Sequence, residues 1–214
     1  MKNISRLHYI TQDLPGFSHA ELAEFACRGG ADWVQLRVKN KSYVEWLMIA
    51  EEVKSVCKKF GAKLIINDNA LIAKEIGADG VHLGKEDMNP KEARKILGNN
   101  FIIGGSSNTM DDVKWLMNNC VDYIGIGPYH FTSTKEKLNP VLGLEGIKAI
   151  AEKFENKIPM IAIGGIKFEE VESLMQTGIQ GVAVSSAINL SDDKTSATKR
   201  FLASLGMTIS VMPL

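Results

Sequence analysis

Eight short apolar runs alternate with longer segments of helical periodicity along this 214-residue chain. Each run is too short for a helix and rich in β-branched residues, which is typical of a buried strand. The runs lie at residues 7–11, 33–37, 63–67, 80–84, 101–105, 123–127, 159–165 and 181–185. A strand followed by a helix eight times predicts a parallel sheet, and in so few residues a closed sheet fits better than an open one. We therefore expect an α/β fold, a single (β/α)8 TIM barrel, with residues 1–214 as one domain.

Local signals mark several helix ends between these runs. Apolar residues at helical spacing predict a helix over Tyr43–Phe60. Asn89 followed by Pro90 is typical of a helix start, and Thr109 is expected to cap a helix over Met110–Cys120. Glycines follow several of the helical segments, where a left-handed residue often ends the helix. These glycines are Gly61, Gly77, Gly98 and Gly178.

The balance of charged residues argues against some classes of binding partner. Twenty-five Lys and Arg balance 25 Asp and Glu, so the formal net charge is zero. This balance argues against a basic surface for nucleic acid and against a polybasic membrane anchor. No apolar run approaches the roughly 20 residues of a spanning helix, and the N-terminus does not resemble a signal peptide. We expect no membrane partner.

The cysteines and the C-terminal tail complete this outline. Cys27, Cys57 and Cys120 are far apart and lack metal-ligand spacing, so we expect buried free thiols in a reducing, cytoplasmic setting. Residues 202–214 form an apolar tail that is too short to span a membrane. The tail is expected to pack on the body of the protein or against a second subunit, which leaves a homo-oligomer open.

Active sites of such barrels lie at the C-terminal ends of the strands, so the residues that follow each run are the candidates. After the second run, alternation places Gln35, Arg37 and Lys39 on one side, facing the barrel mouth. These side chains could bind an anion together with Asn67, which ends the third run. The alternative is that Arg37 and Lys39 form solvated ion pairs at the rim.

Two carboxylates follow neighbouring strands, Asp68 after the third run and Asp87 after the fourth. Mg²⁺ prefers one or two carboxylates together with phosphate oxygens. The pair therefore predicts a Mg²⁺ site. The alternative is that each aspartate only caps the helix that follows it.

The remaining strand ends carry hydroxyls, glycines and a lysine. Ser106 follows the fifth run, and Thr132, Ser133, Thr134 and Lys135 follow the sixth and could form an oxyanion cradle. Glycines and hydroxyls after the last two strands are the usual phosphate site of a barrel. Here these residues are Gly165, Ser185 and Ser186. A tight turn is the alternative for the Gly164-Gly165 pair.

No nucleophile–base pair is visible in the sequence. We interpret His8, His19, His82 and His130 as core or rim histidines with satisfied hydrogen bonds. The basic residues Arg37, Lys39 and Lys135 and the carboxylate pair instead favour ionisation of a pyrophosphate leaving group, aided by electrostatic stabilisation.

These residues together resemble the thiamine-phosphate synthase family, also called thiamine-phosphate pyrophosphorylase. The resemblance covers roughly residues 5–190. The matching stretches are 35–39, 67–68, 80–87, 122–128, 132–135, 140–144, 162–166 and 181–188.

The resemblance implies a transferase that joins a hydroxymethylpyrimidine diphosphate to a thiazole phosphate, through a pyrimidine-methylene cation. The products would be thiamine phosphate and pyrophosphate. It implies that Asp68 and Asp87 bind Mg²⁺ and that Arg37, Ser106 and Lys135 are catalytic. The pyrimidine diphosphate would be bound by Gln35, Leu36, Arg37, Val38, Lys39, Asn67, Ser106 and Lys135. The thiazole phosphate would be held by Thr132, Thr134, Gly165, Ser185 and Ser186. Ser133 is expected among the substrate-binding residues.

Three residues depart from the family pattern, which usually has Glu at Val38, Gln at Lys85 and His at Asn108. Lys85 would bring an extra positive charge near the metal site. Three alternative functions remain on the same barrel: a thiazole tautomerase, a non-catalytic sensor of phosphate ligands, and a sugar-phosphate isomerase. Retention of Arg37, Lys39 and the two aspartates argues against the tautomerase, which needs neither Mg²⁺ nor a diphosphate site.

Overall fold

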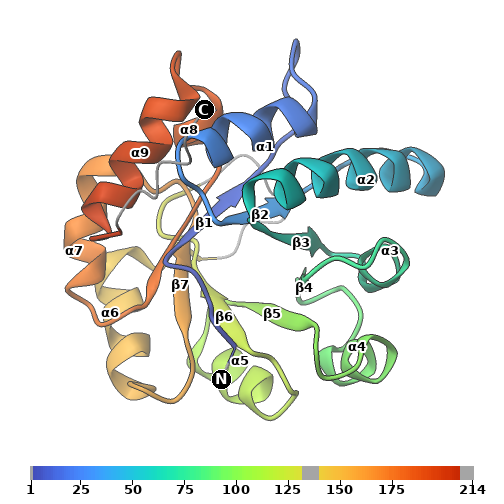
Figure 1. Cartoon of the computed structure of the whole chain (residues 1–214). Coiled ribbons are helices and arrows are strands. Elements are labelled where there is room, and N and C mark those ends of the chain that lie inside the picture. The colour runs from blue at the N-terminus through green and yellow to red at the C-terminus, as the bar shows by residue number, and fades with distance from the viewer. Residues whose placement is uncertain (1, 132–139, 208–214) are drawn as a thin grey trace.

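The computed structural model describes residues 2–131 and 140–207, and these form a closed barrel of eight parallel strands (Figure 1). The strands are β1 (Leu7–Ile10), β2 (Trp33–Leu36), β3 (Lys63–Asn67), β4 (Gly80–Leu83), β5 (Ile102–Ser107), β6 (Tyr123–Ile126), β7 (Met160–Ile163) and β8 (Gly181–Val184). They pair in sequence order, and β1 closes the ring by pairing with β8. The predicted (β/α)8 barrel is confirmed.

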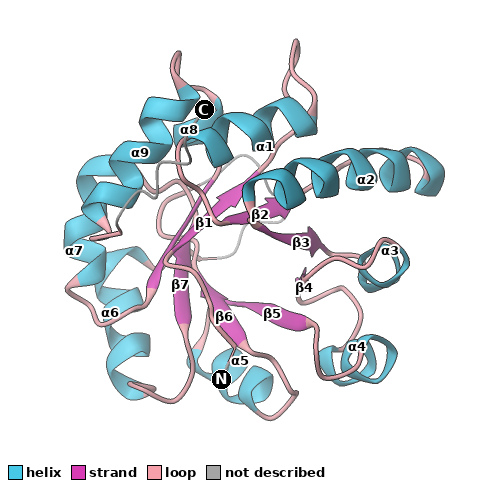
Figure 2. Ribbon diagram, viewed as in Figure 1, coloured by secondary structure: helices cyan, strands magenta, loops and turns pink. Residues whose placement is uncertain are grey.

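Helices surround the ring of strands on its outside (Figure 2). They are α1 (His19–Arg28), α2 (Tyr43–Phe60), α3 (Ala70–Glu75), α4 (Pro90–Leu97), α5 (Met110–Met117), α6 (Gly143–Lys153), α7 (Val171–Met175), α8 (Ser186–Asn189) and α9 (Lys194–Ser204), with a 3-10 turn, η1 (Phe168–Glu170), before α7. No helix among the described residues is long and apolar enough to cross a membrane.

The alternation of side chains along each strand creates two separate cores. One core lies between the strands and the helices and includes Leu36, Leu64 and Val81. The other fills the inside of the barrel and includes Trp33 and Tyr123. Polar residues at the ends of the strands that alternate in phase with Trp33 and Tyr123 also point inward, and therefore lie at the mouth of the barrel.

The local signals in the sequence located most helix ends. Asn89 caps α4 through the Lys91 N–H at 2.9 Å, and Thr109 caps α5 through the Asp112 N–H at 3.1 Å. Gly61 ends α2 in a left-handed conformation, with φ of 68°. The predicted helix Met110–Cys120 is wrong at its C-terminal end. It stops at Met117 because the chain turns through the next three residues, of which Cys120 is left-handed with φ of 65°.

The C-terminal region and the cysteines partly match expectation. Leu202 and Leu205 are buried in the outer core, so this part of the predicted tail packs on the body of the barrel. Residues 208–214 lie outside the described residues. Cys27 and Cys57 are buried free thiols, but Cys120 is exposed, which corrects the expectation of three buried thiols.

Candidate active site

The end of β2 presents the predicted basic residues on one side. Gln35 is buried, Arg37 is half-buried and Lys39 is exposed. This increase in exposure is expected for side chains that lie successively closer to the barrel mouth. Leu36 and Val38 have the opposite alternation and are buried in the outer core. A role of these two residues in binding would therefore fall to their backbone. The apolar burial also explains why a valine is accommodated at position 38.

The segment after β1 fixes this basic end of β2, and sequence reasoning missed it. Thr11 Oγ1 accepts a hydrogen bond from the Arg37 N–H at 3.1 Å, and Asp13 Oδ2 accepts one from the Lys39 N–H at 3.2 Å. The His19 ring lies between these two supports, 2.8 Å from Thr11 Oγ1 and 3.3 Å from Asp13 Oδ1. Their position in the sequence could have identified them, because Thr11 and Asp13 follow a strand as the other candidate site residues do.

Neither aspartate of the predicted metal site is a helix cap. Asn69 caps α3 by accepting from the N–H groups of its first turn, and Asn89 caps α4. Asp87 instead accepts the Gly84 N–H at 2.6 Å, within its own turn after β4. Asp68 has a left-handed backbone, with φ of 67°, which short polar residues adopt more readily than others. Both carboxylates are therefore available at the mouth.

The two carboxyl groups meet above β3 and β4. The pKa of Asp87 is raised to about 6, first by burial and then by the charge of Asp68, which also shares a hydrogen bond with it. Lys39 Nζ lies 2.8 Å from Asp68 Oδ2 and supplies one positive charge. An adjacent pair of this kind is stabilised by a cation, and two carboxylates are what Mg²⁺ takes from a protein when phosphate and water complete its shell. Among residues 2–131 and 140–207, no group of three or more acidic, His or Cys side chains could hold a metal.

Ser106 lies at the end of β5 and is linked to the inside of the barrel. Its Oγ is 2.9 Å from His82 Nε2, and His82 Nδ1 is 2.9 Å from the Tyr123 hydroxyl. His82 is thus a buried histidine with satisfied hydrogen bonds, as predicted. Asn67 pairs in register with His82 and is half-buried at the end of β3. The structure therefore brings Ser106 and Asn67 to one mouth with the aspartate pair.

The opposite side of the mouth is formed by the ends of β7 and β8. Ser185 Oγ and Ser186 Oγ both lie within hydrogen-bond distance of Gln12 Oε1, at 3.1 Å and 3.3 Å. Asn189 Nδ2 donates to Ser185 Oγ at 3.1 Å and to the Ile10 carbonyl at 2.9 Å. Gln12 and Asn189 were missed by sequence reasoning. Gln12 follows the end of β1 closely, so its position could have marked it as a candidate. Asn189 lies one helical turn after Ser185, inside α8, and nothing in the local sequence indicates that it contacts Ser185.

The Gly164-Gly165 pair forms a tight turn after β7. Both glycines have positive φ, 108° and 66°. A Cβ on Gly164 would lie 2.7 Å from Pro128 Cβ, so the turn also needs glycine to pass close to the segment after β6. The pair thus bends the chain sharply, and this leaves the backbone of Gly165 exposed next to the end of β8. A phosphate-binding role for Gly165 stays a prediction.

Four predicted residues cannot be placed in this site. Thr132, Ser133, Thr134 and Lys135 lie outside the described residues. Their neighbour His130 is described, and its Nε2 pairs with Glu170 Oε1 at the end of η1. His8 is buried and stacked on Trp33, with ring centroids 4.2 Å apart. Both histidines have partners and are not placed as free general bases, in line with the prediction.

Two of the departures from the family pattern contact one another. Lys85 Nζ is 2.6 Å from Asp112 Oδ2 on α5 and also donates to Asn108 Oδ1. Burial alone would raise the pKa of Asp112, but hydrogen bonds from Lys85 and Thr109 outweigh burial and lower it. Lys85 is thus paired toward α5, where Asp112 offsets the extra positive charge that was expected near the metal site.

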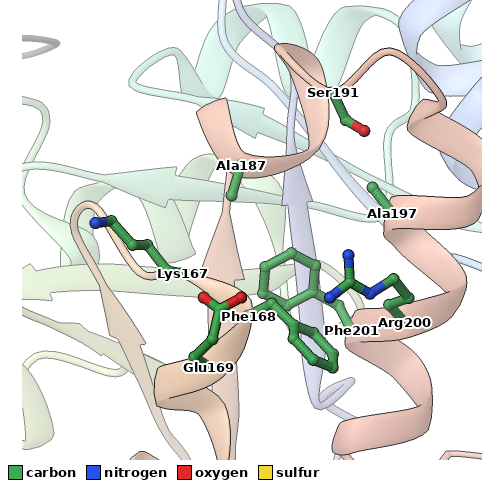
Figure 3. A pocket seen from close by; sticks show the side chains of 8 residues that line it. All are labelled: Lys167, Phe168, Glu169, Ala187, Ser191, Ala197, Arg200 and Phe201. Atoms are coloured by element: carbon green, nitrogen blue, oxygen red, sulfur yellow. The ribbon is translucent and has the colours of Figure 1, made fainter.

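A cavity of about 230 Å³ lies elsewhere, between η1, α8 and α9 (Figure 3). Phe168 and Phe201 lie together at one side of it, and the Arg200 guanidinium sits 4.2 Å from the centre of the Phe168 ring. None of the predicted site residues lines this cavity. The candidate active site is the barrel mouth.

The fold and the mouth define a (β/α)8 barrel whose strand ends gather basic, carboxylate and hydroxyl side chains. A family model described as thiamine monophosphate synthase matches residues 7–188. The chain therefore belongs to the thiamine monophosphate synthase family.

Individual relatives agree with this family. The chain is 45% identical over 199 residues to a thiamine-phosphate synthase of Bacteroides fragilis, covering 92% of this chain and 98% of the relative. It is 47% identical over 193 residues to one of Flavobacterium johnsoniae, covering 89% and 91%. A solved thiamine phosphate pyrophosphorylase from Pyrococcus furiosus superposes with a TM-score of 0.85 at 32% identity, covering 94% of this chain and 95% of that one.

Proposed function

We propose that this protein is a transferase that forms thiamine phosphate and pyrophosphate from a hydroxymethylpyrimidine diphosphate and a thiazole phosphate. The observation that carries the proposal is the meeting of Asp68, Asp87 and Lys39 at one mouth, in a chain of this family. A diphosphate leaving group needs this combination of a cation site and a basic side chain.

In the proposed reaction the bond between the pyrimidine methylene carbon and the diphosphate oxygen breaks, and its electron pair leaves with pyrophosphate. The thiazole nitrogen then donates its lone pair to the methylene carbon. Arg37 and Lys39 bind the diphosphate, and Ser106 donates a hydrogen bond at the same end. Mg²⁺, when bound by Asp68 and Asp87, neutralises charge on the diphosphate.

The thiazole phosphate is proposed to bind across the mouth, at the exposed backbone of Gly165 and the hydroxyls of Ser185 and Ser186. Gln12 Oε1 lies within hydrogen-bond distance of both hydroxyls and holds the two side chains beside each other. On binding, the phosphate oxygens would replace Gln12 as the acceptors of the two serine protons. Such an anchor holds the thiazole nitrogen near the methylene carbon, which lowers the entropic cost of reaction. Buried thiols at Cys27 and Cys57 support a cytoplasmic location. A homo-oligomer stays a prediction.

Product analysis tests the proposal. Purified protein is incubated with both substrates and with each one omitted, in Mg²⁺ or in EDTA, and thiamine phosphate and pyrophosphate are measured by mass spectrometry. We expect equal amounts of both products only with both substrates and Mg²⁺. Isomerisation of the thiazole phosphate alone would replace the proposal with a tautomerase, and binding without turnover would replace it with a sensor.

A matched pair of variants separates the carboxylate site from general surface charge. Asp87→Asn is expected to lower kcat/KM roughly a hundredfold at fixed Mg²⁺, because one of the two metal carboxylates is lost. Asp111→Asn removes a carboxylate from the exposed first turn of α5 and should leave kcat/KM within about twofold. Equal effects of the two substitutions would contradict the placement of the metal.

A further inference from the structure

A chain of three hydrogen-bonding groups runs from the inside of the barrel to its mouth. Tyr123 on β6 and His82 on β4 are buried, whereas Ser106 at the end of β5 is half-buried. The Tyr123 hydroxyl lies 2.9 Å from His82 Nδ1, and His82 Nε2 lies 2.9 Å from Ser106 Oγ. The strand register allows this chain because β5 lies between β4 and β6, and its inward residue Gly104 carries no side chain. A Cβ there would lie 2.2 Å from the Tyr123 ring.

The direction of the hydrogen bonds follows from the buried phenol. Burial raises the pKa of Tyr123 far above its ordinary range, so the hydroxyl keeps its proton. Within the described part of the chain, His82 Nδ1 is the hydrogen-bond partner found for this hydroxyl. If Nδ1 carried a proton, in the other tautomer or in the imidazolium, the buried phenol proton would have no acceptor, which is unfavourable. Tyr123 therefore donates to Nδ1, and the ring proton sits on Nε2.

We infer that His82 is a positioning residue that turns the Ser106 hydroxyl into a donor aimed at the substrate. Because His82 Nε2–H donates to Ser106 Oγ, the serine proton has to be donated elsewhere. Within residues 2–131 and 140–207, His82 is the hydrogen-bond partner found for Ser106 Oγ, so no described residue takes the serine proton and a ligand at the mouth can accept it. A donor fixed before substrate arrives needs no reorganisation as negative charge develops on the departing diphosphate. This step rests on the proposed function.

A merely structural role for His82 makes a different prediction. The ring also packs against Tyr123, with centroids 5.4 Å apart, and its loss would loosen the inside of the barrel. Such loosening would lower stability and would act whether or not position 106 carries a hydroxyl. Coupling between positions 82 and 106 therefore distinguishes positioning from packing.

The kinetic test is a double-mutant cycle. His82→Leu and Ser106→Ala are each expected to lower kcat about 10- to 100-fold with little change in KM, as for other residues that orient a functional group. His82→Leu in the Ser106→Ala background should cost less than about twofold more. His82→Gln places an amide N–H near the Nε2 position and should recover much of the loss. Ile161→Val, inside the barrel but without a polar contact, is the packing control and should leave kcat within about twofold.

A second measurement does not depend on turnover. The chain has four histidines, so ¹⁵N-labelled imidazoles can be assigned by comparison with His82→Gln. At neutral pH we expect the Nε2–H tautomer at His82, and a mixture of tautomers in Tyr123→Phe. An Nδ1–H tautomer, or additive kinetic losses in the cycle, would overturn the inference. A protein that shows the expected tautomer but makes no thiamine phosphate would instead refute the proposed function.

Discussion

Asp87→Asn is expected to stabilise the metal-free protein while it damages the enzyme. The pKa of Asp87 is raised from 3.8 to about 6, and each pKa unit corresponds to about 1.4 kcal/mol between the two protonation states. The ionised carboxylate thus costs at most about 3 kcal/mol. Because Asp87 is only half-buried, solvent screening reduces this figure to about 1–2 kcal/mol. The neutral amide of the substituted side chain avoids the cost, and its oxygen can still accept the Gly84 N–H.

The dependence on pH fixes the sign of this effect. A raised pKa means that the folded protein holds the Asp87 proton more tightly than the unfolded chain. This carboxyl therefore contributes a loss of stability as pH rises from about 4 to about 6, and the loss is complete above that range. The increase in unfolding free energy caused by Asp87→Asn should therefore appear between about pH 4 and pH 6 and stay constant above that range. Asp68→Asn should gain less, because it also removes the partner of Lys39 at 2.8 Å.

Urea unfolding in EDTA at pH 4, 6 and 8 measures this change in unfolding free energy. Repeating the measurement in Mg²⁺ shows how much bound metal stabilises the folded protein. Bound Mg²⁺ stabilises the wild-type protein by about 1.4 kcal/mol at ten times its dissociation constant, and we expect much less for Asp87→Asn. The exposed substitution Asp111→Asn is the control. A variant Asp87→Asn that is less stable than wild type at pH 8 in EDTA would refute the electrostatic reasoning.

Three further outcomes are expected. Gln12→Leu removes the side-chain amide that holds Ser185 and Ser186 beside each other, so KM for the thiazole phosphate should rise about fivefold at unchanged kcat. A lower kcat with the same KM would contradict this role. Lys85→Ala breaks a partly exposed ion pair and should change unfolding free energy by less than about 1 kcal/mol and leave the Mg²⁺ dependence of turnover unchanged. Burial, then the charge of His82, lowers the pKa of His8 well below 6.5, so this ring should remove stability as pH falls below about 6.5, by up to about 1.4 kcal/mol per pH unit. The slope measured by urea unfolding should be shallower in His8→Phe, and equal slopes would exclude His8 as its source.

Local sequence patterns were enough to predict the architecture and the order of its strands and helices. Local periodicity and caps such as Thr109 predict the strands and helices, because both signals involve residues that are near one another in the chain. The same local reading identified Asp68, Asp87 and Ser106, because the residues that follow a barrel strand lie at its mouth. Where a turn depended on a left-handed non-glycine residue, as at Cys120, local reading placed the helix end wrongly.

Which of these residues contact one another could be seen only in the folded barrel. The contacts of Asp68 with Asp87, of Ser106 with His82, and of Lys85 with Asp112 all depend on the register between strands and on the direction of side chains. Register is set by packing across the whole barrel, and no short stretch of sequence encodes it. For the same physical reason, the charge of Lys85 could be counted from the sequence, but its pairing toward α5 could not.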